Sequence, residues 1–296
     1  MIGTQLSLFG PPAPALPAGD LLAGYAKRRG EAAVCVLGSG SGGNSTVVRV
    51  GDKALLIDAG FGPMTVARRL RDANLRLADI AAVCVTHLDQ DHFRPTWLAT
   101  LRRAAIPLFV HRWHLDDLYD LHGEPARQLQ RAGLVEVFDD EPFCPMREVR
   151  VSSFRLAHDT KGTCGFHIET PAGRIGYATD LGHVPTSLFE HFRGVDLLAI
   201  ESNYDPQMQL GSSRPWFLKR RIMGMAGHLS NEQAFDAVRR IVNEGCDGSP
   251  RHIVLLHRSA QCNCPDLVRE LFSQDARIAA RLTLAEQRRC TPWMNL

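Results

Sequence analysis

Short apolar runs, rich in β-branched residues and bounded by polar or turn-forming ones, recur along the chain and predict β-strands. They lie at Ala33–Leu37, Thr46–Val50, Ala54–Ile57, Ala81–Val85, Leu108–Val110, Val149–Phe154, Gly165–Ile168, Ile175–Ala178, Leu197–Ile200 and Ile253–Leu256. Helical periodicity is present at Met64–Ala73, Pro95–Ala104, Trp216–Met225 and Asn231–Asn243. Hairpin-like strands come first, and strands then alternate with helices in both halves. This order predicts an α/β protein with two sheets sandwiched between helical layers.

The first thirty residues have a different pattern. Residues 11–19 are rich in proline and predict an extended, semi-rigid linker. Ahead of them lies the short apolar-aromatic cluster Gln5-Leu6-Ser7-Leu8-Phe9. We therefore predict a disordered tail over residues 1–30 and one globular domain over residues 31–296.

Composition narrows the class of protein. Hydrophobic residues make up 45% of the chain, which is ample for a large core, and the net charge of +2 is uninformative. No apolar run approaches the ~20 residues that a membrane helix needs, and the N-terminus lacks the features of a signal peptide. Eight cysteines are scattered without a disulfide framework. We therefore expect a cytoplasmic protein with reduced thiols and no membrane association.

Side chains that bind metals follow several of the predicted strands. Four of them crowd into the loop after Ala81–Val85, and four more follow other strands. They are His87, Asp89, Asp91 and His92, and then Asp58, His158, Asp180 and His257. Because α/β proteins build their sites where strands end, we expect these side chains to converge on one point. The pattern predicts a metal-dependent hydrolase.

With these residues in this order, the chain resembles the metallo-β-lactamase superfamily over roughly residues 32–296. The resemblance implies a four-layer αββα sandwich with one or two metal ions at a sheet edge. It assigns His87, Asp89, His158 and a bridging Asp180 to one ion, and Asp91, His92, Asp180 and His257 to the second. It makes Asp58 an outer carboxylate that orients a ligand imidazole.

A closer resemblance is to the YycJ (WalJ) branch, whose relatives act as DNA exonucleases. It rests first on the glycine-rich segment 38–45 and on Glu201-Ser202-Asn203-Tyr204-Asp205. Two further motifs are Pro215-Trp216 with Lys219-Arg220-Arg221-Ile222, and Gly227-His228-Leu229-Ser230-Asn231. The last is His257-Arg258-Ser259 with Asn263 and Pro265. Ribonuclease Z-like phosphodiesterases, which are more distantly similar, place a histidine equivalent to His228 near the leaving oxygen.

One residue departs from the family pattern. The family most often has histidine where this chain has Asp89. Aspartate is a harder, anionic ligand, and it shifts metal preference from zinc towards manganese or iron. Flavodiiron proteins, in another branch, carry a glutamate at this position. We therefore expect two divalent ions that are Zn, Mn or Fe.

These residues imply a mechanism for hydrolysis of nucleic acid, most of all DNA. Two metal ions would activate a water molecule, and His228, oriented by Glu201, would protonate the leaving oxygen. Asp58 and Asp91 complete the catalytic set. For substrate binding we name Ser39, Ser41, Asn44, Arg214, Lys219 and Arg220. The simpler alternatives are a tight turn at residues 39–45 and a solvated helix face at residues 219–221.

Three other functions stay open from the sequence. The same scaffold could cleave a small phosphodiester or a thioester, since fold does not fix substrate. A carboxylate-rich site could hold a di-iron redox centre, although no segment resembles a flavodoxin that would supply electrons. The third is a binding scaffold without activity, which an intact ligand set argues against.

The N-terminal cluster suggests a protein partner. Gln5, Leu6, Ser7, Leu8 and Phe9 look like the pentapeptide by which bacterial replication and repair proteins dock on the DNA sliding clamp. An apolar anchor on a flexible tether would enter a preformed groove. The alternative is a chance match, since five-residue motifs recur often.

Overall fold

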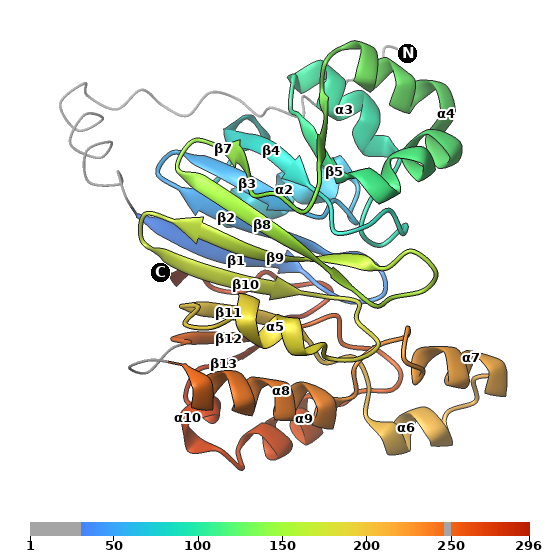
Figure 1. The fold of residues 1–296 in the computed structure, drawn as a ribbon, viewed down its shortest axis with the longest axis vertical. Helices are drawn as coiled ribbons and strands as arrows, with labels where there is room; N and C mark the ends of the chain where they lie inside the picture. Colours follow the sequence, from blue (N-terminus) through green and yellow to red (C-terminus); the bar gives the residue numbers. More distant parts are fainter. Residues whose placement is uncertain (1–30, 246–249) are drawn as a thin grey trace, which may run out of the picture.

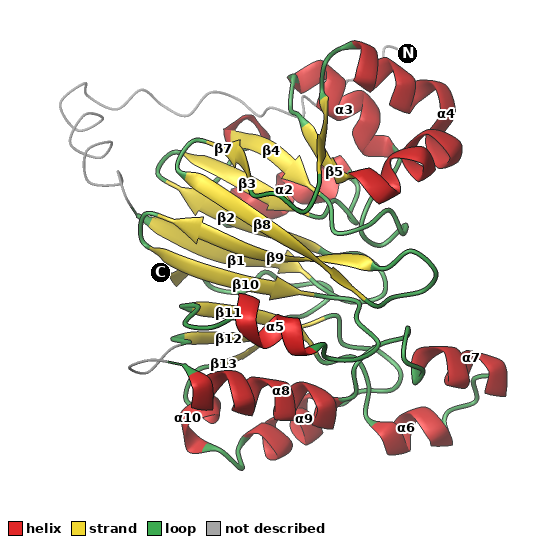
Figure 2. Ribbon diagram, in the orientation of Figure 1, coloured by secondary structure: helices red, strands yellow, loops and turns green. Residues whose placement is uncertain are grey.

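Two seven-stranded sheets pack face to face in the computed structural model, which describes residues 31–245 and 250–296 (Figures 1 and 2). In strand order, the first sheet contains β14 (Met294–Asn295), β1 (Ala32–Gly38), β2 (Ser45–Val50), β3 (Lys53–Ile57), β4 (Ile80–Cys84), β5 (Leu108–His111) and β6 (Val135–Phe138). The second contains β13 (Leu282–Leu284), β12 (His252–Leu256), β11 (Leu197–Glu201), β10 (Gly173–Ala178), β9 (Thr163–Thr170), β8 (Val149–Leu156) and β7 (Phe143–Met146).

Helices cover the outer faces of both sheets (Figure 1). The first sheet carries α2 (Pro63–Asp72), α3 (Thr96–Ala104) and α4 (Leu115–Arg131), and the second carries α5 (Thr186–His191), α8 (Asn231–Glu244), α9 (Pro265–Phe272) and α10 (Ala276–Ala279). Two short helices, α6 (Pro206–Gly211) and α7 (Trp216–Ile222), lie beyond the strand ends of the second sheet. Single 3₁₀ turns occupy Leu77–Asp79 and Arg112–His114. The predicted four-layer αββα arrangement is confirmed.

Central strands are buried on both faces, which explains their nearly continuous apolar runs. In β1, Val34 and Val36 face the second sheet, whereas Cys35 and Leu37 face the helices of the first. Three apolar layers result, one between the sheets and one beneath each set of helices. This packing fixes the position of every central strand end.

The ten predicted strands are all present, within two residues at each end. The four strands that the sequence did not predict, β6, β7, β13 and β14, lie at or next to sheet edges, and two of them are only two or three residues long. β7 also contains Pro145, which is tolerated at an edge. Apolar runs of this length carry too little signal to distinguish a strand from a loop.

Among the helices, α4, α5, α6, α9 and α10 were not predicted. In α4, Gly123 adopts a left-handed φ of 52° and Pro125 follows, so a kink interrupts the helical period. Helix α7 ends at Ile222, three residues before the predicted end, because Gly224 and Gly227 form a tight turn. The capping box of Ser230 and Gln233 starts α8 as predicted.

The predicted tail and the pentapeptide Gln5–Phe9 lie outside the residues that the structure describes, and both stay predictions. Within residues 31–245 and 250–296, no helix has both the length and the apolar character needed to cross a membrane.

Candidate metal centre

Strand direction brings the predicted site residues to one edge of the sandwich. β3 and β4 run parallel in the first sheet, and β10, β11 and β12 run parallel in the second. Their carboxyl ends carry Asp58, the loop His87–His92, Asp180, Glu201 and His257, and His158 follows β8. Groups of these side chains place potential ligand atoms within 4.8 Å of one another. The structure therefore brings together the residues that the sequence analysis named.

The backbone is unusual at three of these positions. Asp58, Asp180 and His257 have φ values of 59°, 54° and 52°, and each lies within two residues of the end of a strand. Residues with a Cβ rarely adopt this left-handed conformation, which costs free energy and persists where surrounding structure enforces it. A Cβ at the neighbouring Gly60 would collide with the Asp91 carbonyl. The loops are thus folded tightly enough to turn three side chains inward.

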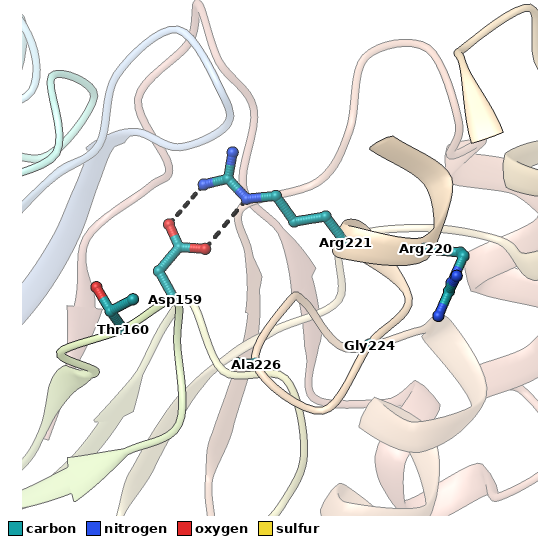
Figure 3. A pocket seen from close by; sticks show the side chains of 6 residues that line it. All are labelled: Asp159, Thr160, Arg220, Arg221, Gly224 and Ala226. Atoms are coloured by element: carbon teal, nitrogen blue, oxygen red, sulfur yellow. Dashed lines mark hydrogen bonds and ion pairs between the residues drawn. The ribbon is translucent and has the colours of Figure 1, made fainter. Parts of the chain in front are cut away.

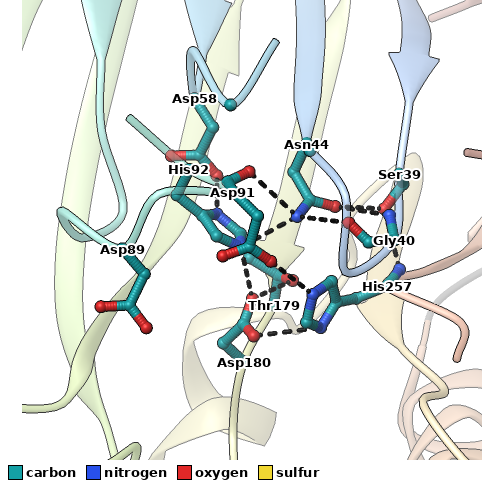
Figure 4. Close-up of polar contacts among 12 residues, drawn as sticks. Ser39, Gly40, Asn44, Asp58, Asp89, Asp91, His92, Thr179, Asp180 and His257 are labelled. Carbon is teal, nitrogen blue, oxygen red and sulfur yellow. Dashed lines mark hydrogen bonds and ion pairs between the residues drawn. The ribbon is translucent and has the colours of Figure 1, made fainter. Parts of the chain in front are cut away.

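The inner half of the site consists of Asp91, His92, Asp180 and His257 (Figure 4). Asp180 bridges two imidazoles, with its Oδ2 atom 2.9 Å from His92 Nε2 and its Oδ1 atom 3.0 Å from His257 Nδ1. His257 Nε2 lies 3.1 Å from Asp91 Oδ2. Asp180 is buried, which opposes its charge, but the imidazoles of His257 and His92 hold its pKa well below the usual value. Asp180 therefore stays ionised as a bridging carboxylate.

Asp58 lies behind the inner half and fixes the orientation of His92. Its Oδ2 atom is 2.7 Å from His92 Nδ1, and Oδ1 accepts hydrogen bonds from the backbone N–H and hydroxyl of Thr86. Asp58 is fully buried. With Nδ1–H donated to Asp58, His92 presents Nε2 to the site, which is the tautomer that binds a metal.

Glu201 ties His257 to His228. Its Oε1 atom lies 2.9 Å from His257 Nδ1 and 2.8 Å from His228 Nδ1, and Oε2 accepts the N–H groups of Leu181 and Leu229. Burial opposes the charge on His228, but the Glu201 carboxylate raises the pKa of this imidazole above its ordinary value. One buried carboxylate therefore positions two functional imidazoles.

The glycine-rich segment supports the site from the side (Figure 4). Ser39 Oγ donates to Asn44 Oδ1 at 2.8 Å and accepts the N–H of His257 at 2.8 Å. Asn44 Nδ2 lies 3.0 Å from His92 Nε2. Both side chains are buried and contact His257 and His92 of the site, and their predicted contact with substrate stays a prediction. Ser41 is exposed and does line the pocket.

The outer half of the site consists of His87, Asp89 and His158. His87 Nδ1 is 2.9 Å from the Thr86 hydroxyl, and His158 Nδ1 is 2.9 Å from the Gly227 carbonyl. His87 and His158 lie close to Asp180, which joins the two halves. Asp89 has a side chain that is 56% exposed, with Oδ2 3.7 Å from His87 Nε2, and it points away from the inner half (Figure 4).

The chemistry of these donors fits divalent ions. His87 Nε2 is buried and has no hydrogen-bond partner among the described residues, as expected for a nitrogen that faces a metal. Burial lowers the pKa of His158 and keeps it neutral, the form that coordinates metals. The ion-pair partners of Asp58, Asp91, Asp180 and Glu201 within the described chain are all histidines. Divalent ions would therefore supply positive charge where only imidazoles balance these carboxylates.

A pocket of about 500 Å³ opens onto both halves. The site residues Asp91, His158, Asp180, His228 and His257 line it, together with Arg214, Leu218 and Arg221 from the region of α7. Arg214 donates hydrogen bonds to Gln209 and Gln261. Lys219 and Arg220 do not line this pocket. Lys219 donates to the Leu210 carbonyl, and Arg220 lines an adjoining hollow.

Sequence reasoning missed several residues that shape the site. Thr86 contacts Asp58 and His87, and the hydroxyl of Thr179 donates to Asp180 at 2.8 Å. Asn203 donates to the His257 carbonyl, and Asp159 lies near Asp89 and His158. Thr86, Thr179 and Asp159 are sequence neighbours of predicted ligands, which was a signal. For Asn203, the only signal in the sequence was its position in the motif that begins at Glu201.

Comparison with known proteins identifies the family. A family model described as a beta-lactamase superfamily domain matches residues 53–257. The exodeoxyribonuclease YycJ of Bacillus anthracis is 28% identical over 242 residues, which cover 81% of this chain and 87% of that protein.

Solved structures share the fold. The short form of human tRNase Z has a TM-score of 0.59 and 19% identity, covering 88% of this chain and 98% of that one. CmlA of Streptomyces venezuelae, a diiron β-hydroxylase, has a TM-score of 0.58 and 14% identity, covering 90% of this chain and 54% of that one. At these identities the likeness shows the fold alone. The chain belongs to the β-lactamase superfamily and is a metal-dependent hydrolase of the metallo-β-lactamase fold.

Proposed function

We propose that this hydrolase is a phosphodiesterase that acts on nucleic acid, and specifically a DNA exonuclease. The observation that carries the proposal is His228, which lines the pocket beside the inner half of the site and is held at Nδ1 by Glu201. A relative of similar length, the YycJ protein, is named an exodeoxyribonuclease. Di-iron redox chemistry is not favoured, because the diiron enzyme shares only the fold.

Each half of the site would hold one divalent ion. His87, Asp89 and His158 with Asp180 would bind one, and Asp91, His92 and His257 with Asp180 would bind the other. When bound, such ions polarise the phosphate and lower the pKa of a water molecule that attacks it. Asp58 and Glu201 would keep the ligand imidazoles in the correct tautomer.

His228 is suited to protonate the leaving oxygen. Because Nδ1 is bound to Glu201, the proton available to substrate is on Nε2 of the imidazolium form. The Glu201 carboxylate favours that form by raising the pKa of His228 against the effect of burial. His228 would therefore act as a general acid.

The identity of the metal is part of the proposal. Interaction with the His87 imidazole lowers the pKa of Asp89 to about 2, so Asp89 would be an anionic ligand at neutral pH. An exposed carboxylate in place of a histidine favours Mn or Fe over Zn in the outer half.

The described cysteines are all free thiols, which supports a cytoplasmic location.

A substrate panel tests the proposal. Bound metal would be measured in the purified protein, and turnover compared on 5′-labelled DNA, RNA, bis-(p-nitrophenyl) phosphate and S-lactoylglutathione, each with added Mn²⁺ or Zn²⁺. We expect stepwise shortening of DNA from one end and slower cleavage of the small diester. Hydrolysis of the thioester without cleavage of any nucleic acid would refute the proposal.

A second part of the proposal concerns the N-terminal pentapeptide. We expect a peptide of residues 1–20 to bind purified sliding clamp through Leu6, Leu8 and Phe9, since an apolar anchor on a tether raises the local concentration of enzyme on DNA. Leu8→Ala combined with Phe9→Ala should abolish this binding and leave hydrolysis of a small diester unchanged. Failure of both the peptide and the full chain to bind clamp would contradict the hypothesis.

A further inference from the structure

The segment around α7 combines positive charge with exposed aromatic rings. No acidic residue lies between Asp205 and Glu232, whereas Arg214, Lys219, Arg220 and Arg221 fall within this stretch. Arg214 and Arg220 have no carboxylate partner among the described residues. The segment is therefore a local positive surface on a chain whose net charge is only +2.

Two aromatic side chains of α7 are exposed to solvent. Trp216 is 64% exposed and Phe217 is 74% exposed. The other large apolar side chains that are exposed within the described residues are all aliphatic: Met64, Leu121, Leu210, Met225 and Leu267. Exposed aromatic rings grouped on one helix indicate a binding surface.

These rings are not needed to hold α7 in place. Leu218 and Ile222, on the opposite side of the helix, pack with Tyr204 and Cys262 in a small apolar cluster. That cluster anchors α7 beside the second sheet. The exposed face is consequently free to contact a partner.

The anchored side of α7 adjoins the pocket that holds the candidate metal centre. Leu218, Arg221 and Ile222 line this pocket together with His228. Arg221 pairs with Asp159 and separates the pocket from a second hollow of about 590 Å³, which Arg220 also lines (Figure 3). The two hollows share Asp159 and Arg221, so the metal-centre pocket is continued on the side of α7 that carries Arg220.

The two rings are followed along α7 by cations at helical spacing. Arg220 follows Trp216 by four residues and Arg221 follows Phe217 by four, so each ring has a guanidinium on its own side of the helix. Single-stranded nucleic acid is bound by this combination, in which bases stack on rings and cations contact the phosphates. Bases of a duplex are already stacked on one another and cannot use such rings.

We propose that α7 is a base-stacking platform that receives single-stranded nucleic acid and leads its end to the metal centre. Trp216 and Phe217 stack on bases, while Arg214 and Arg220 bind the flanking phosphates. The proposal rests on the proposed nuclease function and adds to it a preference for an unpaired strand.

The test compares a double variant of the full chain, Trp216→Ala with Phe217→Ala, with a matched control, Met64→Ala with Leu121→Ala. The control removes exposed apolar side chains from α2 and α4, away from α7. We expect the α7 variant to raise KM for a single-stranded oligonucleotide about 10- to 100-fold. Turnover of bis-(p-nitrophenyl) phosphate should stay unchanged in both variants. Trp216→Phe with Phe217→Tyr keeps both rings and should retain the wild-type KM.

A binding measurement separates this proposal from the proposed function. Oligo(dT) added in EDTA should quench the fluorescence of the wild-type protein, and this quenching should be lost in Trp216→Phe although binding persists. If wild type cleaves no nucleic acid, the proposed function fails, and quenching by oligo(dT) still decides whether the platform exists.

Either of two results would overturn the platform. The alanine variant would keep the wild-type KM and oligo(dT) affinity, or it would lose affinity equally for duplex and single-stranded DNA. Loss of binding to anionic vesicles with oligonucleotide affinity intact would instead assign the surface to a membrane.

Discussion

The two halves of the candidate metal centre differ in how firmly their side chains are held. In the inner half, each imidazole has a buried carboxylate behind it, Asp58 for His92 and Glu201 for His257. In the outer half, His158 is held by a backbone carbonyl, His87 Nε2 has no hydrogen-bond partner among the described residues, and Asp89 is largely exposed. The inner half is therefore formed by the fold, whereas the outer half depends more on the metal that it binds.

This difference has a physical basis. Buried carboxylates remain ionised only when hydrogen bonds and cations surround them, so the inner half is costly to disturb. An exposed carboxylate such as Asp89 is solvated and can move at little cost. Changes to the inner half should thus have larger effects than changes to the outer half.

The largest effect is expected from Asp180→Asn, because Asp180 belongs to both halves. Removing its charge should weaken both ions and lower activity by more than the ~10–100-fold that loss of an outer partner typically causes. Metal content and bis-(p-nitrophenyl) phosphate turnover would be measured. Asp236→Asn on the exposed face of α8 is the control, and equal behaviour of the two variants would remove Asp180 from the site.

Replacement of His228 should affect chemistry alone. His228→Ala is expected to lower kcat by ~10²–10⁴-fold while metal content and substrate affinity stay nearly unchanged, as for a general acid. Metal content, KM and kcat would be determined together. A loss of metal would reassign His228 to the ligand set, and wild-type activity would exclude it from the mechanism.

Asp58→Asn tests the support of the inner half. The neutral amide accepts a weaker hydrogen bond from Nδ1–H of His92 than the carboxylate does, so metal affinity should fall ~10–100-fold. The Kd of the more tightly bound ion would be measured by titration with a chelator. An affinity within twofold of wild type would show that the inner half does not depend on Asp58.

The smallest effect is expected in the outer half. Asp89→His should raise affinity for zinc and lower activation by manganese, because a neutral imidazole replaces a hard anion. Activity would be compared across both metals at matched metal occupancy. If the metal preference does not change, Asp89 is not a ligand and the outer half is completed by another side chain.

Periodicity along the chain was sufficient to predict the interior of the fold. Central strands such as β1 and β11 are buried on both faces, so their apolar runs are long and clear. Edge strands such as β7 and β13 are stabilised mainly by their neighbours, and no local pattern marked them. The kink at Gly123 hid α4 in the same way, since it breaks the period on which a helix prediction depends.

The sequence by itself determined which residues follow the central strands, and hence the set of side chains that meet at one sheet edge. Only the tertiary structure decided how each side chain is used. It joined His228 and His257 through Glu201, turned Ser39 and Asn44 inward, and left Asp89 facing solvent. The reason is that strand-end positions follow from local periodicity, whereas hydrogen-bond partners and exposure depend on segments that are far apart in the chain.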